Sequence, residues 1–264
     1  MGGHKKPDGS GELRDAGGKL RLHVDAPLQA GSRVEPGEAQ RHYLLHVMRA
    51  REGESVLLFN GDDGEWLAEI AQVTRRDCAL ICQRQTRLQD KAPDLWLAFA
   101  PVKKTPAEYL TQKATELGVS LLMPVITEHT VARRVNLDRL RANAIEAAEQ
   151  SERLTVPEIR QPQSLTACLQ AWPAGRGLLF CDEGGDADPI TDALARAGRR
   201  DGWGVLTGPE GGFAPEERRL IRQHGAVLPV TLGPRIMRAD TAALAALAIW
   251  QAQLGDWHSV PSGL

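Results

Sequence analysis

The stretch LTGPEGGFAPEE, residues 206–217, decides the fold. It is a glycine-rich loop between an apolar run typical of a buried strand and Pro215, a residue that suits the first turn of a helix. Loops of this kind between a strand and a helix commonly hold phosphate. This loop carries the carboxylate of Glu210 in its centre and contains no lysine.

The residues of this loop argue against a phosphate ligand. The chain contains neither the GxxxxGK[ST] pattern of a P-loop nor the GxGxxG pattern of a dinucleotide site in this region. Glu210 would repel a phosphate, whereas its carboxylate can accept hydrogen bonds from ribose hydroxyls and tolerates a cation. A positively charged nucleoside is the better match, and S-adenosylmethionine, with its sulfonium centre, fits this description.

A second turn, LGPRIMR at residues 232–238, follows the next apolar strand. In open α/β sheets, ligands bind at the carboxyl ends of the strands, and both turns are expected at that edge. The alternative interpretation is that both are tight strand-to-helix turns that use Gly and Pro only for their backbone angles.

Composition places the chain among ordinary proteins with a packed core. The 264 residues are 42% hydrophobic and 25% charged, with a formal net charge of −2. No apolar run approaches the roughly 18 residues of a membrane span, and the first residues do not read as a secretory signal. The four cysteines form no CxxC pair, which indicates reduced thiols and a cytoplasmic protein.

The pattern changes along the chain and predicts two domains. Residues 1–18 are polar and glycine-rich, and are expected to be a disordered leader. Residues 19–88 contain short β-type runs around the turn NGDDG at 60–64, with one helical segment at 37–50, and predict a small β-barrel.

The second predicted domain spans residues 93–255 and is followed by a tail, residues 256–264. Apolar runs without polar alternation begin near residues 95, 120, 177, 202 and 226, and amphipathic segments separate them. This alternation predicts an α/β fold with a parallel sheet covered on both faces.

The two C-terminal turns also carry a family resemblance. LTGPEGGFAPEE followed by LGPRIMRADTAALAAL resembles the paired signature of the RsmE family, methyltransferases of the SPOUT superfamily. Three further stretches are similar to this family: LTQKATELGV at 110–119, AAEQSERLTVPEI at 147–159 and HYLLHVMRAREGESVLLFNGDDGEWLAEI at 42–70. The resemblance covers roughly residues 20–255 in the family's order.

The resemblance implies a fold and an activity beyond what periodicity shows. The fold would be a small N-terminal PUA-like β-barrel and a C-terminal SPOUT α/β domain with a deep trefoil knot, working as a homodimer. The activity would be methyl transfer from S-adenosylmethionine to N3 of a uridine in 16S rRNA of the small ribosomal subunit. A SPOUT methyltransferase of another rRNA or tRNA site, and a non-catalytic RNA-binding assembly factor, remain as alternatives.

Carried onto this chain, the resemblance implies a cofactor site in three loops: the end of GLLFCDE at 177–183 and the two turns at 208–212 and 232–238. The expected cofactor-binding residues are Leu206, Thr207, Gly208, Pro209, Glu210, Gly211, Gly212, Leu232, Gly233, Ile236, Met237, Arg238 and Thr241. Transfer to a uracil nitrogen needs stabilisation of the anion and removal of a proton, for which Arg238 and either Glu210 or Asp240 are the catalytic candidates. Both carboxylates have structural alternatives, a loop contact for Glu210 and a helix cap for Asp240. Asp240 stands where the family commonly has Glu, and Glu152 where it often has Gly.

Basic residues supply the candidates for RNA contact, although solvated surface charges would look the same. The expected RNA-binding residues are Arg21, Arg49, Lys103, Lys104, Arg133, Arg134 and Arg153. No metal site is expected, because the i, i+4 pair of His42 and His46 has no evident third ligand. Cys78 and Cys82 are expected to be buried thiols.

Overall fold

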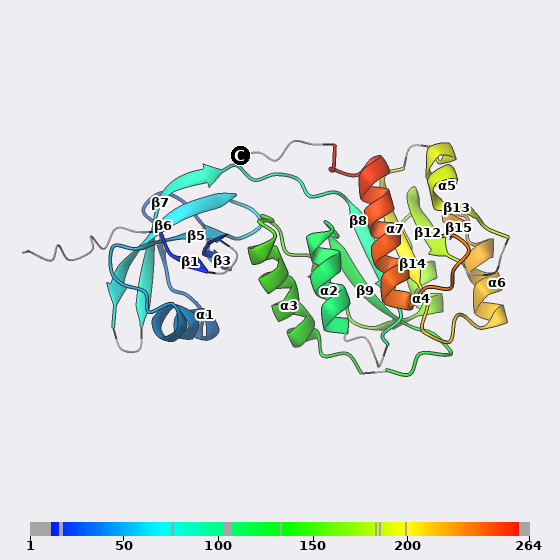
Figure 1. Ribbon diagram of the computed structural model, residues 1–264, viewed down its shortest axis with the longest axis horizontal. Helices are drawn as coiled ribbons and strands as arrows, with labels where there is room; N and C mark the ends of the chain where they lie inside the picture. The colour runs from blue at the N-terminus through cyan, green and yellow to red at the C-terminus, as the bar shows by residue number, and fades with distance from the viewer. Residues whose placement is uncertain are drawn as a thin grey trace, which may run out of the picture. The chain divides into compact units, whose positions relative to one another are not determined.

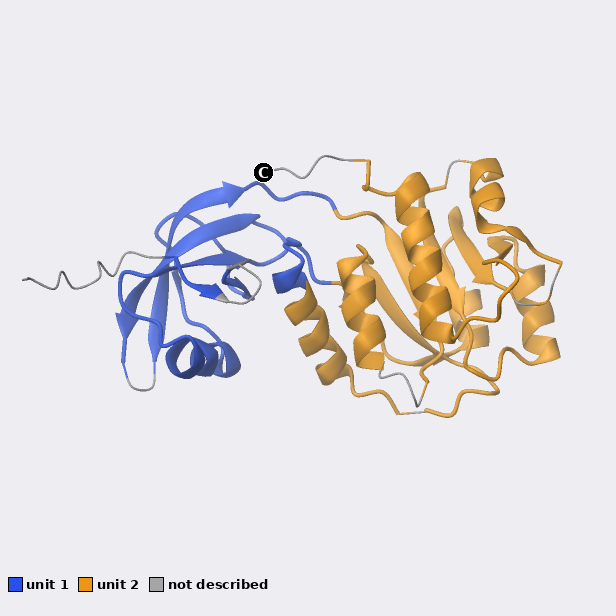
Figure 2. Cartoon of the chain, viewed as in Figure 1, with its two compact units in different colours: residues 1–91, 148–156 blue, residues 92–147, 157–264 orange. Residues whose placement is uncertain are grey.

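The structure is a computed structural model that describes residues 12–15, 18–74, 77–102, 107–132, 134–182, 184, 186–198 and 200–258. The chain divides into two compact units (Figure 2), unit 1 with Met1–Lys91 and Ala148–Val156, and unit 2 with Ala92–Ala147 and Pro157–Leu264. The second segment of unit 1 differs from the contiguous domains expected from the sequence. It joins unit 1 because Ala148 and Leu154 pack against Phe59 in a small apolar cluster.

Unit 1 is built around a five-stranded sheet with the order β3-β5-β6-β7-β4. The first two of these strands are parallel, and the other pairs are antiparallel. Leu22, Val56, Leu58, Ile70 and Leu80 are at most 3% exposed and form the centre of its core. The strands are β3 Arg21–His23, β4 Arg33–Val34, β5 Ser55–Phe59, β6 Glu65–Val73 and β7 Cys78–Arg87.

The turn at 60–64 joins β5 to β6 as the sequence predicts. The side-chain oxygen of Asn60 accepts hydrogen bonds from the N–H groups of Asp62 and Asp63, at 3.0 and 2.9 Å. Gly64 has φ of +77°, and a Cβ there would collide with the backbone of Arg87, so this position requires glycine.

Two short segments complete unit 1. Helix α1, Glu38–His42, continues as a π-helical turn, Tyr43–Val47, inside the predicted helical segment. The strands β1, Arg14–Asp15, and β2, Gly18–Lys19, pair with each other. Ordered structure therefore begins earlier than expected, because Leu13 is 8% exposed and joins the core of unit 1. Residues 1–11, 16 and 17 lie outside the described residues.

Unit 2 contains the predicted parallel sheet, with the order β10-β9-β8-β14-β12-β15-β13 and β11 paired with β9 (Figure 1). Every residue of β14 is buried, and β8, β9 and β12 are nearly so, which is why these strands show no polar alternation. The strands are β8 Leu95–Phe99, β9 Leu121–Ile126, β10 Glu158–Ile159, β11 Gln163–Ser164, β12 Arg176–Cys181, β13 Asp188–Pro189, β14 Gly202–Thr207 and β15 Val227–Thr231.

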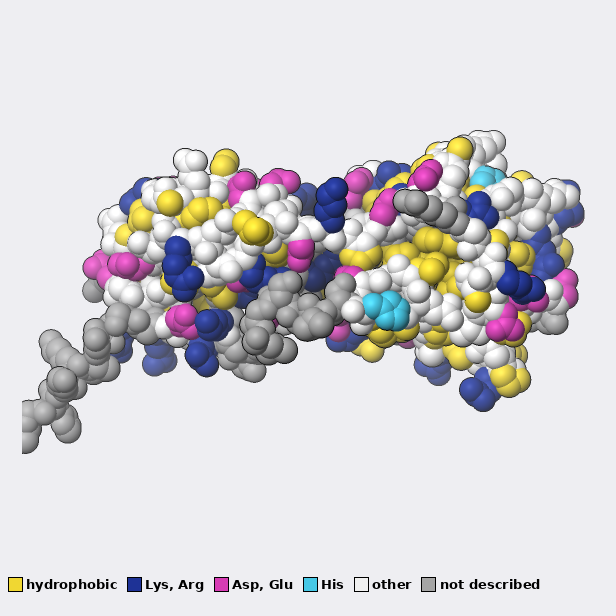
Figure 3. Space-filling view, turned by 90° about the horizontal axis from the view of Figure 1, so that it is seen from above, with side chains coloured by type: hydrophobic (Ala, Val, Ile, Leu, Met, Phe, Trp, Pro, Cys, Tyr) yellow, Lys and Arg dark blue, Asp and Glu magenta, His cyan; other side chains and the backbone are white. Residues whose placement is uncertain are grey.

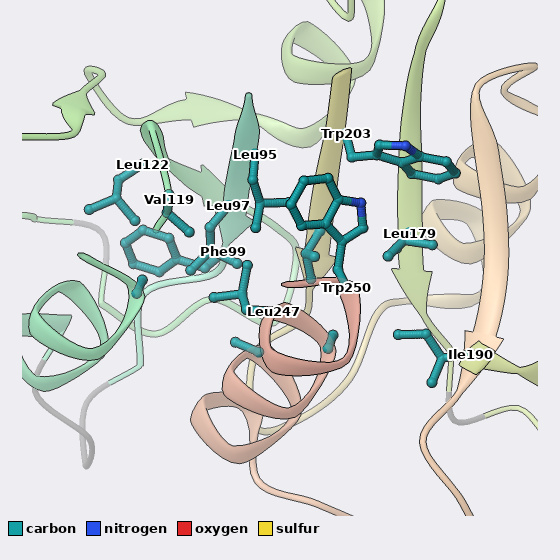
Figure 4. Close-up of a cluster of buried hydrophobic side chains, with 14 of the residues drawn as sticks. Leu95, Leu97, Phe99, Val119, Leu122, Leu179, Ile190, Trp203, Leu247 and Trp250 are labelled. Carbon is teal, nitrogen blue, oxygen red and sulfur yellow. The ribbon is translucent and has the colours of Figure 1, made fainter. Parts of the chain in front are cut away.

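Two apolar clusters cover the two faces of this sheet. One contains Leu97 and Val205 of the sheet and Leu247 and Trp250 of α7 (Figure 4). The other contains Leu206 of β14 together with buried residues of α4 and α6. The helices are α2 Ala107–Glu116, α3 Leu137–Gln150, α4 Leu165–Gln170, α5 Ile190–Arg196, α6 Pro215–Gln223 and α7 Ala239–Leu254. None of the described helices has the length and apolar character needed to span a bilayer.

Glycines in the central strands make room for tryptophan rings. A Cβ on Gly204 of β14 would lie 2.5 Å from the ring of Trp172, and a Cβ on Gly177 of β12 would lie 2.5 Å from the ring of Trp203. The indole N–H of Trp172 donates to the carbonyl of Arg176 at 3.1 Å, so this ring is held in place and cannot easily move aside.

We predict that Gly204→Ala lowers the free energy of unfolding by about 1–3 kcal/mol, because the added methyl group overpacks the core. Chemical denaturation measures this change. Gly225→Ala is the control, since a Cβ at Gly225 meets nothing within 4 Å. Equal stability of the two variants would show that Trp172 moves freely.

Candidate functional site

A cavity of about 650 Å³ lies at the carboxyl ends of β12, β14 and β15, beside the first residues of α7. Three loops of unit 2 form it, and they are the three loops that the resemblance implies. The lining residues are Phe180, Cys181, Asp182, Thr207, Gly208, Pro209, Glu210, Gly212, Phe213, Arg218, Val230, Thr231, Leu232, Gly233, Pro234, Arg235, Ile236, Met237, Arg238, Ala239 and Ala242.

The glycine-rich loop after β14 is shaped by an aromatic contact. A Cβ on Gly208 would lie 2.7 Å from the ring of Phe213, so glycine lets the loop fold back over this ring. Phe213 packs edge-on against Phe180 of β12, with 5.3 Å between the ring centroids. Gly212 has φ of +67°, in the left-handed region that favours glycine. The glycines therefore bring backbone groups, rather than side chains, to the cavity wall.

The loop that follows β9 braces the glycine-rich loop from outside. His129 Nδ1 lies 3.1 Å from the carbonyl oxygens of both Gly211 and Gly212, and this nitrogen carries the proton if it bonds to them. The Glu217 carboxylate accepts hydrogen bonds from the N–H groups of Glu128 and Ala214, at 2.9 and 3.1 Å. The latter contact also caps the first turn of α6.

The turn after β15 is open to solvent. Gly233 has φ of +107°, and Ile236 is 89% exposed. Arg238 precedes α7 directly, is exposed and lines the cavity, and its carbonyl accepts the N–H of Ala242 at 2.9 Å. Its position next to the start of α7 therefore puts Arg238 on the wall of the cavity.

A charged network that was not predicted residue by residue borders the cavity. Asp182, which directly follows β12, accepts hydrogen bonds from Nε of Arg218 and Arg222 on α6, at 2.8 and 2.7 Å. Asp186 pairs with both arginines as well. Burial favours the neutral form of Asp182, but the bonds from Arg218 and Arg222 outweigh it and hold the pKa below its ordinary value. The spacing of Arg218 and Arg222 by four residues was the only sequence signal of this network.

Most of the expected cofactor residues lie on the cavity wall. Three do not: Leu206 is 1% exposed within the core, Gly211 turns its carbonyl to His129, and Thr241 lies in the first turn of α7. The residues that do line the cavity are Thr207, Gly208, Pro209, Glu210, Gly212, Leu232, Gly233, Ile236, Met237 and Arg238.

The two candidate acids differ in position. Glu210 is exposed and lines the cavity. Asp240 borders a separate small cavity with Phe99 and Ala107, and its Oδ1 accepts the N–H of Thr241 at 2.8 Å. Asp240 is not the cap of α7, since Arg238 holds that position, but a carboxylate in the first turn is favourable at the positive end of a helix.

Each of the two units matches a known domain family. Residues 89–251 match the model of the RNA methyltransferase domain, and residues 36–81 match that of the RNA methyltransferase PUA domain. Ribosomal RNA small subunit methyltransferase E of Rickettsia conorii is 30% identical over 229 residues, covering 86% of this chain and 93% of the relative. The chain belongs to this methyltransferase family.

Two solved structures of such methyltransferases share the fold. A methyltransferase from Legionella pneumophila, crystallised with SAM, has a TM-score of 0.79 and 30% identity, covering 88% of this chain and 97% of its own. Ribosomal RNA small subunit methyltransferase E from Neisseria gonorrhoeae, bound to S-adenosyl methionine, has a TM-score of 0.81 and 26% identity. The match covers 90% of this chain and 99% of the solved chain. The α/β unit and the PUA-like N-terminal unit are thereby established as family features.

Arg21, one of the expected RNA-binding residues, is buried in unit 1. It is 4% exposed, and its Nε donates to Glu65 Oε2 at 2.8 Å. Its remaining nitrogens donate to the carbonyls of Ala148, Glu149 and Arg153 at 3.1 Å. The guanidinium is thus used to hold the segment Ala148–Val156 within unit 1, and no phosphate can reach it.

The other RNA candidates differ in accessibility. Arg49 and Arg134 are exposed, whereas Arg153 is half-buried and donates to the hydroxyl of Thr155 at 3.1 Å. Lys103, Lys104 and Arg133 lie outside the described residues. Exposure keeps Arg49 and Arg134 available to a polyanion.

No group of three or more metal-ligating side chains occurs in the described part of the chain. The rings of His42 and His46 lie 4.8 Å apart, tilted by 49° to each other. Cys78 and Cys82 are buried as expected, and burial raises the pKa of both thiols.

We predict that Arg21→Met lowers the free energy of unfolding by about 3–5 kcal/mol, because Glu65 then remains buried without its counter-ion. Denaturant titration of the full chain tests this, with Arg49→Met expected to change stability by less than about 0.5 kcal/mol. Unchanged stability of Arg21→Met together with weaker RNA binding would restore a direct role for Arg21.

The lowered pKa of Asp182 predicts an acid-dependent contribution to stability. The stability that its ionised carboxylate contributes is complete above the ordinary aspartate pKa of 3.8. This contribution is lost as the pH falls through the lower pKa of the folded state. The free energy of unfolding should therefore fall more steeply below about pH 4 in the wild type than in Asp182→Asn. If the free energy of unfolding falls equally steeply with acid in both proteins, Asp182 does not make this contribution.

Proposed function

We propose that this chain transfers a methyl group from S-adenosylmethionine to N3 of a uridine in 16S rRNA of the small ribosomal subunit. The observation that carries the proposal is the cavity that three loops form in the methyltransferase unit. Relatives named ribosomal RNA small subunit methyltransferase E supply the substrate class. Action on a ribosomal subunit also implies the cytoplasm as the place of work.

The cavity residues fit this cofactor. A volume of about 650 Å³ lies within the range of sites for small molecules. Glycine backbone and the apolar side chains of Phe180, Leu232 and Met237 suit the base and sugar of a nucleoside. Both solved relatives were crystallised with this cofactor bound.

The cofactor supplies an electrophilic methyl group when it is bound, and the chain supplies position and charge. The three loops orient the ligand so that the uracil nitrogen approaches the methyl carbon in line. Arg238 at the mouth of the cavity stabilises negative charge on the uracil ring as its N3 proton leaves. Glu210 is the better-placed acceptor for this proton, because Asp240 borders a different cavity.

The strand order supports a trefoil-knotted SPOUT fold. β14 lies between β8 and β12, while β15 lies on the far side of β12. The chain must therefore return across β12 after β15 to place α7 against β14, and it does so through the turn at 232–238. Such a return past the loops after β12 and β14 is the path that a knot requires.

Exposed apolar surface supports a homodimer. Ile236 is 89% exposed in the turn that precedes α7, and Trp257 is 53% exposed after it. Figure 3 shows hydrophobic side chains gathered on one face of unit 2. An exposed apolar face of this kind is typical of an interface.

The PUA-like unit binds RNA in this proposal, with Arg49 among its contacts.

Two alternatives remain testable: a methyltransferase of another rRNA or tRNA site, and a non-catalytic RNA-binding assembly factor. The deciding experiment offers radiolabelled S-adenosylmethionine with 30S subunits, free 16S rRNA and tRNA, and maps the methyl group by mass spectrometry. Label at uridine N3 of 16S rRNA is expected. Label only in tRNA or on a ribose oxygen refutes the proposal, and RNA binding without transfer supports the assembly factor.

We predict that Arg238→Ala lowers kcat by roughly 100-fold, the effect of removing a donor that acts on developing charge. The Kd of the cofactor should change little, because the role is felt mainly in the transition state. Single-turnover kinetics and calorimetry separate the two quantities. Arg219→Ala is the control, since Arg219 is exposed on α6 and does not line the cavity. Equal losses in both quantities would reassign Arg238 to cofactor binding.

A further inference from the structure

Asp182 is a buried carboxylate on the wall of the cavity. Its side chain is 2% exposed, and its N–H donates to the carbonyl of Val230 at 2.9 Å, which fixes its backbone between β12 and β15. Neither glycine turn contains it. A buried charge is costly unless it is paired, and Arg218 and Arg222 pair with this one.

The described hydrogen bonds of Asp182 leave one acceptor position open. Oδ1 accepts from Arg218 Nε at 2.8 Å and from the N–H of Gly184 at 3.1 Å, whereas Oδ2 accepts from Arg222 Nε at 2.7 Å. Each carboxylate oxygen can accept about two hydrogen bonds. Within the described residues, Oδ2 can therefore accept one more donor.

The surrounding charges select the kind of donor. Arg218 and Arg222 already lie against Asp182 and are held in turn by Asp186, at 3.0 and 2.6 Å. Two positive and two negative charges balance within this network. Because these charges balance, a further cation gains no net attraction and would bring an unpaired charge into a buried position, whereas a neutral hydroxyl group adds no charge. The open position on Oδ2 therefore suits a hydroxyl donor better than an ammonium group.

We propose that Asp182 Oδ2 accepts a hydrogen bond from a ribose hydroxyl of the adenosine cofactor, an inference that rests on the proposed function. Arg218 and Arg222 are positioning residues, because they hold the carboxylate charged and oriented. Since both arginines belong to α6, which begins directly after the glycine-rich loop, the same contacts couple the hydroxyl position to that loop.

Calorimetry with S-adenosylhomocysteine and its 2′-deoxy and 3′-deoxy analogues tests the assignment on the unmodified protein. Loss of the contacting hydroxyl should weaken binding roughly 10- to 100-fold, because a buried charged acceptor loses its donor. In Asp182→Asn, the same ratio should contract to roughly 2- to 5-fold, the worth of a neutral hydrogen bond. Thermal unfolding confirms that the variant is folded.

Asp186→Asn is the matched control. Asp186 contacts the same two arginines, but its side chain is 63% exposed and does not line the cavity. This variant should keep the wild-type ratio between S-adenosylhomocysteine and the sensitive deoxy analogue. A ratio that falls equally in both variants would show that the network only shapes the loops, and would overturn the assignment.

Other outcomes overturn the inference and leave the proposed function intact. Equal binding of all three ligands to the wild type excludes a hydroxyl contact, and this arm does not depend on any variant. If Asp182→Asn instead abolishes discrimination against an analogue without the amino group, the open position binds the ammonium. Failure of the wild type to bind S-adenosylmethionine or S-adenosylhomocysteine at all would refute the proposed function itself.

Discussion

The pairing of β14 on both of its edges is the constraint on which the rest of unit 2 depends. β8 and β12 occupy these edges, and all six residues of β14 are buried. Both faces and both edges of β14 are therefore closed, and the chain can leave only at the strand's end. The glycine-rich loop begins at that end, with α7 packed over the same strand.

Glycines allow aromatic rings to pack closely both in the strands and beneath the glycine-rich loop. Gly177 and Gly204 admit Trp203 and Trp172 into the layers beside the sheet, and Gly208 admits Phe213 beneath the loop. In each case, the absence of a Cβ lets an aromatic ring approach the backbone. The glycines near the cavity thus serve packing as well as access, and the two interpretations of the glycine turns are not exclusive.

Helix α6 holds the glycine-rich loop from its far end. Its first turn is tied to the loop after β9 through Glu217, and its middle is tied to Asp182 through Arg218 and Arg222. A loop anchored at both ends loses little entropy when a ligand binds, which is the general benefit of preorganisation. The charges involved are mutually compensated, so they hold the loop without repelling a neutral or cationic ligand.

The sequence by itself did not determine the short elements α4, β10, β11 and β13, but it determined the five central strands of the parallel sheet and the position of the two turns. These follow from local periodicity and from Gly and Pro, which act within a few residues. Only the tertiary structure decided that Arg21 is buried against Glu65 and that Asp182 joins Arg218 and Arg222, because these partners lie 36 to 44 residues apart in the chain. Charged side chains look alike in a sequence whether solvated or buried, since burial depends on what the remainder of the chain places beside them.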